Sequence, residues 1–131
     1  MTMRYILLLK TEENSALGAP PKELMDAIAK HGEEMTKAGV LLDTGGLAPS
    51  ATGARIRLSG GKVTTTDGPF TETKELIASY ALVQVKSKEE AVELAARFLR
   101  LHQEHWAGWE GESEVRKLLG PEDFALGFGQ D

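Results

Sequence analysis

The stretch Tyr5-Ile-Leu-Leu-Leu9 decides the fold, because it is apolar at every position. A strand with one face in water alternates apolar and polar residues, whereas an unbroken apolar run indicates a strand that is covered on both faces. Arg4 and Lys10 mark the ends of this run. We therefore expect a β-strand here, with something other than the domain's own helices covering its second face.

Two amphipathic helices are predicted outside this strand. The first begins near Pro21, ends at Gly39 and carries one apolar stripe at steps of three and four residues: Leu24, Ile28, His31, Met35 and Ala38. The second follows the capping box Ser87-Lys-Glu-Glu90 and runs to about His102. Its stripe consists of Ala91, Ala95, Phe98 and His102.

The remaining strands are shorter. Val40-Leu41-Leu42 begins a second strand that Gly45-Gly46 is expected to break, and Gly60-Gly61 predicts a two-residue hairpin turn. That turn joins Arg55–Ser59 to Lys62–Thr66, and further strands are expected at Ser79–Lys86 and Glu114–Leu119.

The resulting order, β-α-β-(β-hairpin)-β-α-β, predicts an α+β, ferredoxin-like domain with an inserted hairpin. It places both helices on one face of an antiparallel sheet and leaves the other face apolar. Because such a face usually marks a partner, we expect a homodimer formed sheet to sheet. The domain is expected to span residues 1–119. Residues 120–131 would form a C-terminal tail that can dock through Phe124, Leu126 and Phe128.

Composition restricts the classes of function. The chain has 131 residues, a net charge of −5 and no cysteine. Thiolate chemistry and disulfides are therefore excluded, and the acidic balance argues against a broad nucleic-acid footprint. The apolar run near Tyr5 is too short for a membrane span, so we expect a cytoplasmic protein that binds neither membrane nor nucleic acid.

The most specific stretch is Val63-Thr-Thr-Thr-Asp-Gly-Pro-Phe-Thr-Glu-Thr-Lys-Glu75. Its Asp67-Gly-Pro-Phe70 core resembles the DGPF-type branch of the YCII-related family, and Met3–Leu8, Glu34–Leu42, Gly46–Pro49 and Glu114–Arg116 resemble further segments of that family. The resemblance covers the chain to about Leu119 and implies a dimeric α/β barrel.

The functional implications of the resemblance are two. One is enzyme chemistry by a histidine–aspartate pair, and the other is an association with sigma-factor regulation. The family's histidine would fall near Ile28, whereas the histidine of this helix is His31, one turn later. The resemblance transfers residue by residue only to Asp67, Gly68, Pro69, Phe70, Glu72, Lys74 and Glu75.

The turn has two readings. In the structural one, Asp67 accepts backbone N–H groups, Gly68 supplies positive φ, Pro69 fixes φ and Phe70 fills the core. In the functional one, Asp67 or Glu72 acts as a base or ligand acceptor beside Lys74. Our candidate catalytic residues are Asp67 and His31, and our candidate ligand-binding residues are Phe70, Glu72, Lys74, Glu75 and Arg57.

Other polar groups carry competing interpretations. His31 is either a hydrogen-bonded core histidine or an acid/base group paired with Asp43 or Asp67. His102 and His105 lack a placed third ligand, so no metal site is predicted. The chain has no dinucleotide or Walker pattern, and we expect no cofactor. Arg55 and Arg57 form a solvated strand face or recognise an anion.

Two hypotheses therefore remain. In the first, a small polar ligand binds in a cleft between the sheet, the first helix and the Asp67–Phe70 turn, with or without acid/base catalysis. In the second, the protein is a non-catalytic module that binds a ligand or a protein in transcriptional regulation. A cavity of several hundred cubic ångströms with converging polar groups favours the first.

Overall fold

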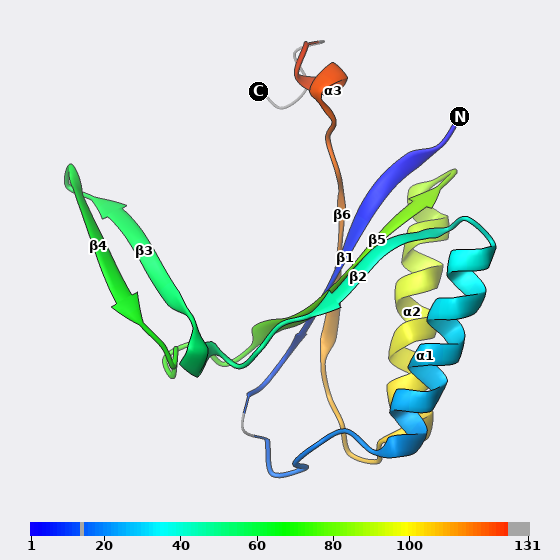
Figure 1. Ribbon diagram of the computed structural model, residues 1–131, viewed down its shortest axis with the longest axis horizontal. Helices are drawn as coiled ribbons and strands as arrows, with labels where there is room; N and C mark the ends of the chain where they lie inside the picture. The colour runs from blue at the N-terminus through cyan, green and yellow to red at the C-terminus, as the bar shows by residue number, and fades with distance from the viewer. Residues whose placement is uncertain (14, 126–131) are drawn as a thin grey trace.

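The structure, a computed structural model, describes residues 1–13 and 15–125. Four strands form one antiparallel sheet in the order β2-β5-β1-β6 (Figure 1). They are β1 (Met3–Thr11), β2 (Leu41–Gly46), β5 (Leu76–Val85) and β6 (Glu112–Lys117). The apolar strand β1 therefore lies inside the sheet and pairs with β5 on one side and β6 on the other. This strand order agrees with the split β-α-β plan expected from the sequence.

Two helices, α1 (Lys22–Lys37) and α2 (Lys88–His105), lie side by side on one face of the sheet (Figure 1). Beneath them every second side chain is buried in the middle of β1 and at the end of β5. The buried apolar residues of this layer are Tyr5, Leu7, Leu9, Leu24, Val83, Val85, Ala91 and Ala95. The result is an α+β domain whose core lies between the helices and the sheet.

The helix ends follow the expected signals closely. The backbone N–H of Glu90 donates to Ser87 Oγ, and Glu90 Oε2 accepts from the backbone N–H of Lys86, the residue before the N-cap Ser87. After α1, Gly39 takes a φ of +75°, which favours glycine. Both helices therefore begin and end close to the predicted residues, although α2 continues one turn beyond His102.

A hairpin of β3 (Ala54–Ser59) and β4 (Lys62–Asp67) projects away from the sheet and the helices (Figure 1). Gly60 and Gly61 have φ values of +59° and +75°, which confirms the predicted two-residue turn. One face of the hairpin is apolar and exposed, with Ile56 at 66%, Leu58 at 72% and Val63 at 64% exposure. The 3₁₀ turn η1 (Ser50–Thr52) precedes the hairpin.

The prediction that Gly45-Gly46 breaks the second strand was wrong, since β2 continues through both glycines. A Cβ on Gly45 would lie 2.9 Å from the Tyr80 ring of the neighbouring strand, so the glycine lets that ring pack close to β2. Two other strands are displaced from their predicted bounds. β5 begins three residues earlier than expected, and β6 covers Glu112–Lys117.

Within the segment predicted as a tail, α3 (Pro121–Ala125) forms a short helix in which the Phe124 side chain is 54% exposed. Leu126 and Phe128 lie outside the described residues, so their predicted docking stays a prediction, as does the domain boundary at residue 119. In the described part of the chain, no helix has the length and apolar character needed to cross a membrane.

Candidate functional site

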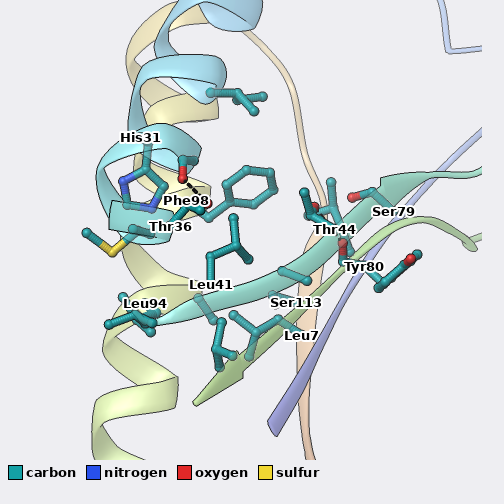
Figure 2. Close-up of a pocket in the computed structure, with 18 of the residues that line it drawn as sticks. Leu7, His31, Thr36, Leu41, Thr44, Ser79, Tyr80, Leu94, Phe98 and Ser113 are labelled. Carbon is teal, nitrogen blue, oxygen red and sulfur yellow. Dashed lines mark hydrogen bonds between the residues drawn. The ribbon is translucent and has the colours of Figure 1, made fainter. Parts of the chain in front are cut away.

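A cavity of about 350 Å³ lies between the helices and the sheet (Figure 2). Side chains from both helices and from the β1, β2 and β5 strands line it, and most of them are apolar. Examples are Leu7, Leu41, Leu94 and Phe98. The polar groups on its wall are hydroxyls of serine and threonine and the imidazole of His31. This volume lies within the range of small-molecule sites, which are mostly apolar with a few polar groups.

His31 lies on α1 and is half-buried at the wall of this first cavity. Burial is the main cause that lowers the pKa of His31 below its ordinary value of 6.5, and the nearby Arg97 charge lowers it further. Glu34 acts in the opposite direction without reversing the shift. The imidazole is therefore neutral at pH 7 and can accept or donate one hydrogen bond at each ring nitrogen according to its tautomer.

A second, wider cavity of about 900 Å³ adjoins the first. The two share the lining residues Leu9, Ile28, Thr44, Ser79 and Phe98. The second cavity extends toward the C-terminal end of α2 and is lined there by His102, Trp106 and Trp109. The two cavities are therefore neighbours and are together called the hollow, with His31 lining the first and His102 the second.

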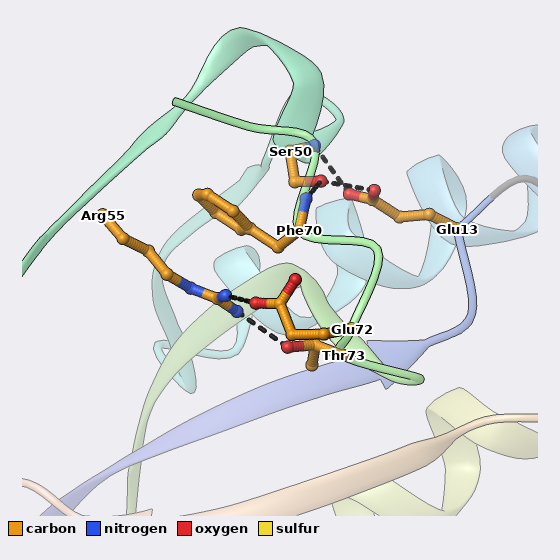
Figure 3. A network of polar contacts seen from close by, with 6 residues as sticks. All are labelled: Glu13, Ser50, Arg55, Phe70, Glu72 and Thr73. Carbon is orange, nitrogen blue, oxygen red and sulfur yellow. Dashed lines mark hydrogen bonds and ion pairs between the residues drawn. The ribbon is translucent and has the colours of Figure 1, made fainter. Parts of the chain in front are cut away.

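The Asp67–Glu75 segment lies at the base of the hairpin and is fixed by contacts within the chain (Figure 3). The carboxylate of Glu13 accepts from both the backbone N–H and the hydroxyl of Ser50, each at 2.7 Å. The same Ser50 hydroxyl accepts from the Phe70 N–H at 3.0 Å. Ser50 is almost completely buried, so these contacts are well shielded from water.

Arg55 of β3 completes this attachment. Its guanidinium lies 3.9 Å from the centre of the Phe70 ring, pairs with Glu72 and donates to the Thr73 hydroxyl at 2.8 Å. A Cβ on Gly68 would overlap the Ser50 carbonyl, and the Gly68 N–H donates to Gly53 O at 2.9 Å. Gly68 is absent from the residues with positive φ, so the expected role of its φ was wrong and close approach is the reason for glycine.

The structure separates the sequence-predicted site residues into two groups. Phe70, Glu72 and Lys74 line a depression of about 320 Å³ beside the turn. Asp67, Glu75 and Arg57 are exposed, and the Asp67 side chain bonds to none of the described residues. No residue of the 67–75 segment lines either cavity under the helices, where His31 lies. The described residues therefore form no cleft that combines the first helix with the turn.

Asp43, the other predicted partner of His31, forms its hydrogen bonds with different residues. Asp43 Oδ2 accepts from the Tyr80 hydroxyl at 2.9 Å, and its other oxygen accepts from the Thr44 N–H. No described residue forms a hydrogen bond or ion pair with His31, so a histidine–aspartate dyad is absent from the described part of the chain. Among these residues, no group of three or more His, Asp and Glu could hold a metal ion.

Sequence reasoning missed Glu13 and Ser50. They lie 37 residues apart, in a loop and in a 3₁₀ turn, and neither position carries a periodic signal. The sequence also did not indicate the role of His102, which was placed on a helix stripe and considered with His105 only as a metal pair that lacks a third ligand. The signal that the sequence offered for His102 was a polar residue on an otherwise apolar helix stripe.

These features define a small α+β protein with an antiparallel sheet and a hollow beneath its helices. Residues 3–107 match the YCII-related domain. The chain is also similar to an uncharacterized protein of Rhizobium meliloti (strain 1021), with 32% identity over 97 residues, which cover 71% of this chain and 77% of the relative. The chain therefore belongs to the YCII-related family.

Proposed function

We propose that this protein binds a small, mostly apolar molecule in the first cavity. The observation that carries the proposal is a hollow of about 350 Å³ in the middle of the fold, walled by aliphatic and aromatic side chains. A cavity of this kind favours burial of an apolar ligand at about 25 cal/mol for each Å² removed from water. The neutral His31 imidazole supplies one polar contact that orients the ligand.

An acid/base role for His31 is a further step of the same proposal. A histidine whose pKa lies below 6.5 is unprotonated at pH 7 and is available as a general base. Binding alone does not require this role. A His31→Gln variant that binds ligand but loses turnover would separate the two.

The test is a cavity-filling substitution. Ala81 lines the first cavity, and Ala81→Leu adds methyl and methylene groups to it. We expect neutral hydrocarbon probes without a hydrogen-bond donor, such as toluene, to bind the wild-type protein in saturation-transfer NMR and to lose binding in Ala81→Leu. Ala27→Leu is the matched control, since Ala27 lies on α1 and lines neither cavity. Equal probe binding in Ala81→Leu and wild type would overturn the proposal.

A polar ligand at the turn is the second candidate. The observation that favours it is the depression beside Phe70, Glu72 and Lys74, where the exposed Lys74 ammonium bonds to none of the described residues. Arg57, Glu75 and the proposed catalytic Asp67 would then act from the surrounding surface. Anion binding that is lost in Lys74→Met but kept in Lys62→Met would support this site.

We also propose that the protein is a homodimer of the ferredoxin-like, barrel-forming type. The support is the sheet face opposite the helices, where Ile6, Leu8 and Leu82 alternate with the buried side chains of β1 and β5. The exposed apolar face of the hairpin is a further apolar surface that a second copy would cover. Sedimentation at micromolar concentration tests the assembly, and a single monomeric species would contradict it.

Membership of the DGPF branch is proposed from the Asp67-Gly-Pro-Phe70 sequence. A role in sigma-factor-associated regulation stays a prediction from the family resemblance. It is separable from ligand binding, because it requires a protein partner that the first cavity does not accommodate.

A further inference from the structure

The second cavity contains a buried imidazole that the proposed function does not use. His102 lies on α2 with only 4% of its surface exposed. Its Nδ1 lies 2.9 Å from the carbonyl of Phe98. A carbonyl only accepts, so Nδ1 carries the proton of the neutral ring and Nε2 is left with an unshared electron pair.

The Nε2 atom has no hydrogen-bond partner among the described residues. No fully enclosed side-chain nitrogen or oxygen in this part of the chain lacks a partner. The Nε2 atom is therefore reachable from the cavity that His102 lines. The site consequently offers a fixed hydrogen-bond acceptor at the end of a hydrophobic hollow.

Aromatic rings hold this imidazole in place. The Phe98 ring meets it edge-on at a centroid distance of 4.9 Å, and the Trp109 ring lies over it at 4.3 Å. Trp106 lies nearly parallel to Trp109, with 6.4 Å between ring centroids. A Cβ on Gly111 would occupy the place of the Trp109 ring, so the glycine allows this packing. The ring orientation of His102 is thereby fixed before any ligand arrives.

The charge at the same cavity is negative. Glu12 and Glu110 line it, both are exposed, and neither side chain bonds to a described residue. The described lining contains no lysine or arginine. Such a site disfavours anions and favours cations, which the faces of the two indoles also attract.

We propose that the second cavity, at His102, Trp106 and Trp109, binds an arylalkylamine, protonated at neutral pH, that carries a hydroxyl or N–H donor on its ring. The donor bonds His102 Nε2, the ring packs against the indoles, and the ammonium group lies toward Glu12 and Glu110. His102 thus acts as a specificity-determining acceptor. This site goes beyond the first cavity and does not require that cavity to be filled.

Tyramine is the probe, and the readout is the indole N–H signals in ¹H–¹⁵N NMR. The two tryptophans of the chain both line the second cavity, so their signals report on this site directly. We expect tyramine to shift both signals at millimolar concentration. We expect 3-(4-hydroxyphenyl)propanoate, which replaces the ammonium with a carboxylate, to bind at least about tenfold more weakly because of the negative rim.

The acceptor role is tested by His102→Phe, which keeps an aromatic ring and removes Nε2. We expect the affinity for tyramine to fall about tenfold, the effect of one neutral hydrogen bond, and the affinity for 2-phenylethylamine, which lacks the hydroxyl, to stay unchanged. His105→Phe is the matched control on the same helix, because His105 does not line the cavity. Glu12→Gln with Glu110→Gln, both at exposed sites, tests the charge without disturbing the core.

Three results would overturn the proposal. They are no shift of the indole signals with tyramine, an affinity for the carboxylate analogue equal to that for tyramine, or an equal loss of affinity for tyramine and 2-phenylethylamine in His102→Phe. Ala81→Leu distinguishes the two sites, because Ala81 lines only the first cavity. Tyramine binding that persists in Ala81→Leu supports the second site even if the first cavity binds nothing.

Discussion

The Asp67–Glu75 turn and the hollow beneath the helices differ in how their polar groups are hydrogen-bonded. At the turn, Ser50 accepts from the Phe70 N–H, Arg55 pairs with Glu72 and donates to Thr73, and Glu13 holds Ser50 in place, so most of the segment is bonded within the chain. In the hollow, His102 keeps one ring nitrogen without a described partner beside a large volume. A distinctive sequence motif can therefore serve to hold a hairpin to the rest of the fold. The residues that line a cavity need not belong to any recognisable motif.

The largest expected effect is at the turn. Gly68→Ala would place a Cβ on the Ser50 carbonyl, and because backbone on both sides must move, we expect the free energy of unfolding to fall by about 3 kcal/mol. Urea denaturation measures the change. The control is Gly46→Ala, whose Cβ meets nothing within 4 Å and whose φ is not positive, so it should be close to neutral. Equal effects of the two variants would contradict close packing at Gly68.

The next effect concerns the hydrogen bonds of Ser50. Ser50→Ala removes a donor to Glu13 and the acceptor of the Phe70 N–H, so a partly buried amide loses its partner. We expect a loss of about 2 kcal/mol in the free energy of unfolding. Ser59→Ala, at an exposed hairpin position, serves as the control. A loss no larger than that of Ser59→Ala would show that the turn is held by other contacts.

Acidification probes the hollow. Burial lowers the pKa of His102 and of His31 below 6.5, so below that pH the unfolded chain binds more protons than the folded chain. Stability is therefore complete above pH 6.5 and falls as the pH drops from there through the folded pKa values. Thermal unfolding between pH 7.5 and 5 measures the effect, which we expect to be smaller than that of Ser50→Ala because the hollow is open to solvent.

The double variant His31→Gln with His102→Gln should have a flatter stability profile in this window. The lowered pKa of Glu114, which arises mainly from its hydrogen bond with Lys10, affects stability only below about 4.5 and leaves the histidine window distinct. A profile that falls equally in wild type and double variant would assign the dependence to other groups.

The smallest effect is expected at Asp67. Because this side chain is exposed and bonds to no described residue, Asp67→Asn should change the free energy of unfolding by less than about 0.5 kcal/mol. Toluene and tyramine should bind the variant as they bind wild type. Loss of either ligand would connect the turn to the hollow and remove the contrast between the two regions.

Much of the secondary structure was predictable from local chemistry. The stripe from Leu24 to Met35, the capping box at Ser87 and the glycine pair at Gly60 each act through neighbours a few residues away. The prediction failed at Gly45, where the deciding contact is the Tyr80 ring on another strand. It failed again at Gly68, where the deciding atom is the Ser50 carbonyl.

The sequence by itself determined the order of helices and strands, the two-residue hairpin turn and the apolar character of β1, because these depend on periodicity and local backbone preference. The tertiary structure alone decided which polar groups stay unpaired. Ser50 meets Glu13 across 37 residues, and Arg55 reaches Thr73 across 18 residues. Such pairings depend on how distant segments pack, and no local pattern encodes them.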